Sequence, residues 1–326
     1  MRRAFLDPRV SIRVIARTPL LYAEGPSLAE DRPGHVRAAS GVARLGGRLA
    51  IVQDDALFVA LAETDRAGAV RAVALPRGEG GLRLFGEDRG NKHAKLDLEA
   101  CFTLTLDDEE TLVALGSGSS AVRDRIVLVA DGRVPRVLEA RRLYDALHAE
   151  TRFSGSELNV EGATRHGDRV LLASRGNGAP CDGREPLDAT VELELAAFVA
   201  FLRDPIGSPV PTLGNVTTYD LGTAGGGRLT FTDLTSDPEG DRVLYAAAAE
   251  ASPDATRDGP VSGCAIGVLG EAPRYGLVHD ERGALLTEKI EGIACVPGEP
   301  DRLVAVIDVD DPSRPAERLT LALASL

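Results

Sequence analysis

The stretch EGATRHGDRVLLASRGN (residues 161–177) has the layout of a β-hairpin. An extended run opens on an acidic residue and a small one, turns at Gly167-Asp168, and returns as an apolar strand that ends in polar residues. Four other segments of the chain share this layout. The five segments open at Ser40, Glu99, Glu161, Asp233 and Glu291.

The spacing of the five openings indicates a repeat. Successive openings lie 59, 62, 72 and 58 residues apart, and each interval has room for two more short strands. In the first interval these are ALFVALA (residues 56–62) and AVRAVAL (residues 69–75). Four short strands per interval, separated by turn residues, are typical of the blades of a β-propeller. The spacing favours five blades of four-stranded antiparallel sheet, with six as the alternative because the longest intervals could hold a degenerate blade.

The two ends of the chain are expected to meet in one blade. The last repeat holds about three strands before residue 326. The alternating strand SIRVIAR (residues 11–17) is expected to supply the missing one and close the ring. A closed ring leaves no exposed sheet edge, which favours this arrangement. The sequence therefore predicts an all-β fold, with a single β-propeller domain over residues 1–326 and one short helix at residues 141–150.

Charge and hydropathy exclude several classes of partner. The chain has 326 residues, with 37 Lys+Arg against 50 Asp+Glu and a net charge of −13. A nucleic-acid-binding surface needs a basic stripe, and with only three lysines the chain has no polybasic segment. The longest apolar stretch, LAAFVAFL (residues 195–202), is far shorter than the roughly 20 residues that span a bilayer. No apolar signal core follows Met1, so a cytoplasmic protein is expected, or a periplasmic one if a leader was removed.

The openings of the repeats gather carboxylates around one point. The first strand of a blade lies nearest the axis, so Glu99, Glu161, Asp233 and Glu291 are predicted to face one axial mouth. Carboxylates so close repel one another and need protons, cationic side chains or a metal. Calcium takes about six to eight oxygen ligands and suits them best, so these four are the predicted metal ligands. The alternative is that each carboxylate accepts backbone hydrogen bonds from a neighbouring blade and fixes the packing of the ring.

Cationic residues near the openings and one polar insertion are the candidates for binding a substrate. The segment EASPDATRDG (residues 250–259) follows the fourth hairpin, either as a lid with substrate contacts or as a solvated loop. The chain has no G-K-[ST] loop and no C-x-x-C pair, so no nucleotide or redox cofactor is expected. The predicted substrate-binding residues are Arg37, Lys95, Arg175, Glu250, Asp254, Arg257 and Asp258.

Several strings of the sequence resemble a known family. They are DRPGHVRAASG (31–41), KLDLEA (95–100), LVALGSGSS (112–120), LNVEGA (158–163), FTDL (231–234), AAAEASPDATRDGPVSG (247–263) and KIEGIA (289–294). Together they resemble bacterial β-propellers related to the group labelled "esterase-like activity of phytase". Propeller phytases, which are more distantly similar, hydrolyse phytate with calcium ions on the axial face. The resemblance supports Glu99, Glu161, Asp233 and Glu291 as site residues without assigning their chemistry.

Two functions are predicted from these observations. The first is a metal-dependent hydrolase of esters or phosphoesters, in which the axial carboxylates hold calcium and Glu161 is the catalytic general base. The second is a non-catalytic propeller that captures a small ligand or a protein segment at the same mouth. The expected partner is a small molecule at the axial mouth, with no nucleic acid and no membrane.

Overall fold

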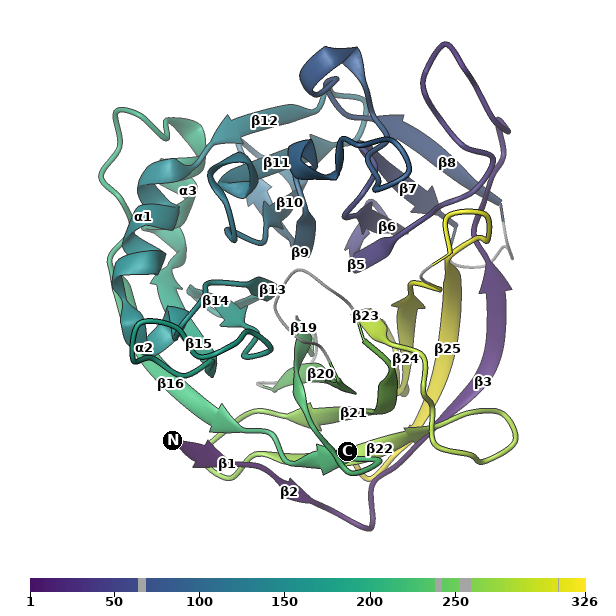
Figure 1. Ribbon diagram of the computed structural model, residues 1–326, viewed down its shortest axis with the longest axis vertical. Coiled ribbons are helices and arrows are strands. Elements are labelled where there is room, and N and C mark those ends of the chain that lie inside the picture. Colours follow the sequence, from purple (N-terminus) through teal and green to yellow (C-terminus); the bar gives the residue numbers. More distant parts are fainter. Residues whose placement is uncertain (64–68, 238–241, 252–258, 310) are drawn as a thin grey trace.

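The computed structural model describes residues 1–63, 69–237, 242–251, 259–309 and 311–326. Its strands form antiparallel sheets arranged as a ring around a central axis, which confirms the predicted all-β propeller (Figure 1). We call each set of four consecutively paired strands a blade. The innermost strands of the first to fifth blades are β5 (Ala39–Leu45), β9 (Leu98–Leu106), β13 (Val160–His166), β19 (Thr230–Ser236) and β23 (Ile290–Val296).

Each blade continues outward by antiparallel pairing. The second strands are β6 (Arg48–Gln53), β10 (Glu109–Gly116), β14 (Arg169–Ser174), β20 (Val243–Glu250) and β24 (Glu299–Ile307). The third strands are β7 (Phe58–Ala62), β11 (Arg125–Ala130), β15 (Asp188–Glu194), β21 (Val261–Val268) and β25 (Glu317–Ala324). The outermost strands are β8 (Ala69–Ala74), β12 (Arg136–Glu139), β16 (Leu213–Asp220), β22 (Arg274–His279) and, in the fifth blade, β3 (Ser11–Pro19).

The N-terminal strand closes the ring as predicted. β3 pairs antiparallel with β25, from Ser11 opposite Ala324 to Pro19 opposite Glu317. Three two-residue strands flank it, namely β1 (Arg2–Arg3), β2 (Phe5–Leu6) and β4 (Leu21–Tyr22), and they pair in parallel with β16, β22 and β8. Residues 1–22, which we call the N-terminal belt, therefore run along the outside of four blades (Figure 1).

The core lies between the blades. Five clusters of buried apolar side chains each fill the space between two neighbouring blades. Burial of this apolar surface stabilises the packing of neighbouring blades by about 25 cal/mol for each Å² removed from water. The five clusters consist largely of Val, Leu, Ala and Ile, as expected for a chain that has no Trp.

Short helices lie in the connections. The predicted helix at residues 141–150 is confirmed as α1 (Arg141–Ala149), which buries Leu143, Tyr144 and Leu147. The apolar stretch at residues 195–202 forms a helix, α3 (Leu195–Arg203). Among the described residues, none of the helices is long and apolar enough to cross a membrane. The remaining elements are α2 (Thr151–Ser154), the 3-10 turns at Glu79–Gly81, Lys92–Ala94 and Ala121–Arg123, and the hairpin of β17 (Thr223–Ala224) with β18 (Gly227–Arg228).

A β-bulge recurs at the same place in every innermost strand. The pairing with the second strand shifts register there and leaves one residue of the innermost strand unpaired. A bulge turns its side chain out of the regular alternation, and bulges are common beside functional sites. The five bulge residues are Ser40, Glu99, Glu161, Thr232 and Glu291.

In the fourth blade, the structure shifts the predicted alignment of the repeats by one residue. Thr232 is its bulge residue, whereas the sequence pattern aligned Asp233 with the other openings. A bulge adds one residue to a strand without any mark in composition, so the pattern could not fix the register at this point.

Glycine follows the bulge residue where neighbouring innermost strands touch. A Cβ atom at Gly292 would lie 2.7 Å from the backbone nitrogen of Val42, and one at Gly162 would lie 2.9 Å from that of Leu234. Only a residue without a side chain permits this approach. The repeated Glu-Gly motif therefore combines a side chain aimed at the axis with close backbone packing between blades.

Candidate functional site

A cavity of about 360 Å³ opens on the axis where the innermost strands begin. Four of the five blades contribute to its lining, which includes six cationic and nine anionic side chains. We call it the axial cavity. Three of the bulge residues, Glu99, Glu161 and Glu291, bring carboxylates to its wall, and Ser40 brings a hydroxyl group. The bulges thus explain why polar side chains converge here.

One group of charges joins the first and second blades. Lys95 Nζ lies 2.5 Å from Asp54 Oδ2 and 2.5 Å from Asp97 Oδ1. The other oxygen of Asp97 contacts Arg123 Nη1 at 2.8 Å and accepts a 2.5 Å hydrogen bond from the hydroxyl of Ser117. These contacts fix a buried ammonium between two carboxylates.

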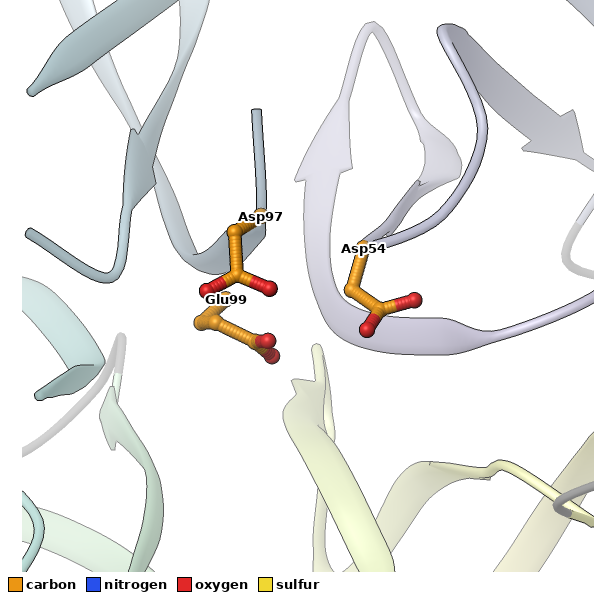
Figure 2. A group of neighbouring side chains, drawn as sticks. All are labelled: Asp54, Asp97 and Glu99. Carbon is orange, nitrogen blue, oxygen red and sulfur yellow. The ribbon is translucent and has the colours of Figure 1, made fainter. Parts of the chain in front are cut away.

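The carboxylate of Glu99 differs from those of Asp54 and Asp97 in its contacts. In the part of the chain that the structure describes, no hydrogen bond or ion pair reaches its carboxylate. Burial, together with the charges of Asp97, Glu161 and Asp54, raises the pKa of Glu99 well above its usual range. Oxygen atoms of Asp54, Asp97 and Glu99 all lie within 4.8 Å of one another. Figure 2 shows these three side chains gathered around the space between the two blades, where they could hold a metal ion.

A second group of charges joins the third, fourth and fifth blades. Arg175 Nη2 contacts Glu250 Oε2 at 2.5 Å, and its Nη1 lies 3.3 Å from Glu161 Oε1. The same oxygen of Glu161 accepts a 2.8 Å hydrogen bond from Asn159 Nδ2. Lys289 Nζ lies 2.9 Å from Glu291 Oε1. Unlike Glu99, these carboxylates all have cationic partners.

Asp233 is placed differently from the other three predicted ligands. It is fully buried and does not line the axial cavity. Its Oδ1 accepts the backbone N–H of Leu234 and its Oδ2 accepts that of Ile293, both at 2.7 Å. The second bond crosses from the fourth blade to the fifth, so this carboxylate makes the blade-packing contact that was the alternative role for all four. Burial raises the pKa of Asp233 well above its usual range.

The cavity wall carries an excess of unpartnered polar atoms. Ten buried side-chain nitrogen or oxygen atoms of the described residues have no hydrogen-bond partner, and five of them belong to residues of the cavity lining. Buried polar groups are almost always paired with protein or ordered water, so water or a ligand could bind at these atoms. The five atoms are Arg37 Nε, Asp54 Oδ1, Asp55 Oδ1, Arg123 Nε and Glu291 Oε2.

The chain matches, over residues 35–323, the family described as "Family of unknown function (DUF6929)". It belongs to this family. None of the curated proteins matches it.

Several solved structures have a similar overall fold but low sequence identity to this chain. Glutaminyl cyclase of Myxococcus xanthus has 10% identity and a TM-score of 0.45, with 97% of each chain covered. The PQQ-bound aldose sugar dehydrogenase of Streptomyces coelicolor has 12% identity and a TM-score of 0.42, with 98% of this chain and 99% of that one covered. A putative gluconolactonase has 10% identity and a TM-score of 0.40, with 98% and 94% covered.

Lysine is reserved for the cavity in this DUF6929 chain. Its only three lysines are Lys92, Lys95 and Lys289, and all three line the axial cavity, while the other 34 cationic residues are arginines. An ammonium group is a compact point charge that several carboxylates can surround, whereas a guanidinium is planar and pairs through its edges. The three lysines can be picked out from the sequence alone, and in the structure they all lie at the site.

The structure brings together most of the residues predicted from sequence. Arg37, Lys95, Arg175, Glu99, Glu161 and Glu291 line the axial cavity, and Glu250 is joined to it through Arg175 and Lys289. Asp254, Arg257 and Asp258 lie outside the described residues. Asp54, Asp97 and Arg123 also line the cavity, although none of them was among the predicted ligands or substrate-binding residues. Asp54 ends the first hairpin beside an opening, and Asp97 lies two residues before another, so both had a signal in the repeat.

Proposed function

We propose that the protein is a hydrolase of small polar esters or phosphoesters, with its active site in the axial cavity and a divalent cation, calcium by preference, as cofactor. The observation that supports this most directly is the unpartnered Glu99 beside Asp54 and Asp97. A carboxylate left without a partner among others is typical of a metal ligand, because a cation relieves the repulsion that raises its pKa. The resemblance to the "esterase-like activity of phytase" group agrees with this proposal.

The donor set suits a hard cation. Asp54, Asp97 and Glu99 offer only oxygen atoms, and Asp54 Oδ1 is buried with no partner. Calcium prefers such ligands and accepts carboxylates through one oxygen or both. The ammonium of Lys95 already lies between Asp54 and Asp97, so a cation would compete with Lys95 for them.

Other residues of the cavity wall supply a general base and donors for a substrate anion. Asn159 and Arg175 hold the carboxylate of Glu161 in one orientation, which suits it to take a proton from water as the general base. Arg37 and Arg123 carry buried Nε atoms with no partner in the cavity wall and can donate to a substrate oxyanion. A bound divalent cation would polarise the scissile bond and lower the pKa of water.

Calcium titration tests the cofactor. Wild type, Glu99→Gln and Glu139→Gln are compared by calorimetry; Glu139 is an exposed carboxylate that pairs with Arg125, so its variant controls for the loss of one charge. We expect equal affinity in wild type and Glu139→Gln, and affinity at least about tenfold weaker in Glu99→Gln. No heat and no thermal shift with wild type would remove the metal from the proposal.

A panel of nitrophenyl esters and phosphoesters then tests the chemistry. Glu161→Gln is expected to lower turnover by about 100-fold or more, since a general base contributes at least that factor. Its calcium affinity should fall less than that of Glu99→Gln, because Glu161 is near enough for its charge to act on Glu99 but is not in the group of Asp54, Asp97 and Glu99. Turnover that survives this substitution would remove Glu161 from the mechanism.

The second candidate is a non-catalytic receptor for a small polar molecule. Lys95 and Arg123 together balance the charges of Asp54 and Asp97 without any metal, which favours ligand binding by the cavity as it stands. A ligand that raises the melting temperature in the presence of a chelator, with no turnover in the panel, would support this function over hydrolysis.

A further inference from the structure

A second cavity, of about 500 Å³, opens at the opposite ends of the innermost strands. We call it the distal cavity. All five innermost strands contribute to its lining, each with the residue four positions after its bulge. These residues are Arg44, Thr103, Arg165, Ser236 and Cys295.

A layer of apolar side chains separates the distal cavity from the axial cavity. It consists of the residues two positions after each bulge, which are at most 3% exposed and belong to five different interblade clusters. The two cavities are therefore distinct sites at the two ends of one axis. The residues of the layer are Val42, Cys101, Ala163, Leu234 and Ile293.

Positive charge dominates the distal cavity, although the chain as a whole carries −13. Within the described residues, neither Arg44 nor Arg165 has a carboxylate partner. Arg44 Nη2 lies 3.4 Å from the carbonyl oxygen of Gly47, and Arg165 Nε donates to that of Gly167 at 3.2 Å. The only carboxylate of the described lining, Asp237, is neutralised by Arg242 at 2.7 Å.

The rest of the lining combines hydroxyl groups with an apolar floor. Thr164 Oγ1 and Ser236 Oγ lie 3.1 Å apart across the third and fourth blades. Phe102 and Leu234 supply apolar surface beside them. Burial and the charge of Asp237 raise the pKa of the Cys295 thiol to about 11, so it stays neutral and does not repel an anion.

We propose that the distal cavity binds a small organic anion through the guanidinium groups of Arg44 and Arg165. Guanidinium matches the paired oxygens of a carboxylate or a phosphate ester, and hydroxyl groups add donors to the same oxygens. The apolar floor accommodates a short hydrocarbon body. This site does not depend on the function proposed for the axial cavity.

Binding of hexanoate, hexyl phosphate and the neutral hexanamide, followed by calorimetry, tests the proposal. Wild type is compared with Arg44→Gln/Arg165→Gln and with a control, Arg136→Gln/Arg282→Gln. The control removes the same two charges from exposed arginines whose side chains make no hydrogen bond or ion pair with the described residues. We expect wild type and control to bind at least one of the two anions but not hexanamide, and the double variant at Arg44 and Arg165 to bind at least about tenfold more weakly.

Because Arg44 and Arg165 are not buried, their replacement should leave the fold intact, so weaker binding would report the loss of the binding site and not the loss of the fold. Equal melting temperatures of the two double variants verify this. Preference for hexanoate or for hexyl phosphate identifies the head group. No binding of either anion to wild type, or equal weakening in both double variants, overturns the proposal.

Discussion

The ammonium of Lys95 lies 2.5 Å from Oδ2 of Asp54, and this contact crosses from the second blade to the first. Burial alone would lower the pKa of Lys95, but the nearby carboxylates of Asp54, Asp97 and Glu99 raise it well above its usual range. Lys95 is therefore a permanent cation within a group of carboxylates, in the place where a metal would compete.

Replacement of Lys95 by Met should expose that competition. Lys95→Met keeps the bulk of the stem but leaves Asp54 without its cation and Asp97 with Arg123 alone. We expect the free energy of unfolding in a chelator to fall by about 3 kcal/mol, the usual result of breaking a buried ion pair. Calcium should restore part of the loss, and it should stabilise Lys95→Met more than wild type in urea denaturation.

Lys92→Met is the matched control, because Lys92 is 38% exposed and pairs with the exposed Glu87. Its free energy of unfolding should change by no more than about 0.5 kcal/mol. Equal losses in the two variants, or calcium stabilisation that does not increase in Lys95→Met, would contradict a cation site at this position.

Gly292 should not tolerate a side chain. Its Cβ would meet backbone atoms of the first blade, Val42 N at 2.7 Å and Gly41 Cα at 2.8 Å, which cannot rotate away. Gly292→Ala is expected to destabilise the protein by about 1–3 kcal/mol in chemical denaturation. Gly34→Ala, where the nearest atom would lie at 3.6 Å, should be close to neutral. Comparable stability of the two variants would show that the blades do not touch at Gly292.

The closing strand should stabilise the ring through one face only. Ile12 is fully buried against the cluster between the fourth and fifth blades, whereas Ile15 on the same strand is 43% exposed. Ile12→Ala should cost about 3 kcal/mol of unfolding free energy and Ile15→Ala less than about 0.5 kcal/mol. If both cost the same small amount, β3 does not contribute to the closed ring as described.

Thiol reactivity should distinguish one cysteine from the other three. Cys181 is exposed, whereas burial raises the pKa of Cys264 to about 12 and that of Cys295 to about 11. Burial also raises the pKa of Cys101. At pH 8 only about one Cys295 in a thousand is a thiolate, and this fraction rises about tenfold with each pH unit.

An aromatic disulfide reagent should therefore modify one thiol rapidly in the native protein and all four in denaturant. Cys181→Ser should abolish the rapid phase. Two or more rapid thiols at pH 8 in the native protein would show that Cys101, Cys264 or Cys295 is more reactive than its surroundings imply.

The hairpins and the closing strand could be predicted because local signals mark them. Turn residues such as Gly167-Asp168 punctuate each hairpin, and the alternation in residues 11–17 identifies a strand without a neighbour in sequence. The helix α3 had no such mark, because a run of eight apolar residues fits a buried strand or a helix equally well. Its interpretation depends on what packs against it.

The site was predicted in part for a related reason. Glu99, Glu161 and Glu291 follow the repeat, so the pattern places them at the axis, whereas the bulge at Thr232 moves Asp233 out of step. Asp97 and Arg123 meet only after the second blade folds and brings together segments that are distant in sequence. Partner choice among charges is a property of the folded ring, which no local pattern encodes.

The N-terminal belt has a consequence for how the protein is made. β3 leaves the ribosome well before its partner β25, which lies about 300 residues further along the chain. At about 5–20 residues per second, β3 waits roughly 15–60 s for the strand it must pair with. Until β22 and β25 have been made, Ile12 and Val14 have no neighbouring strand to cover them. β3 is synthesised before the strands of the first blade but completes the fifth, so a chain truncated before β25 would expose an apolar edge that chaperones and proteases can recognise.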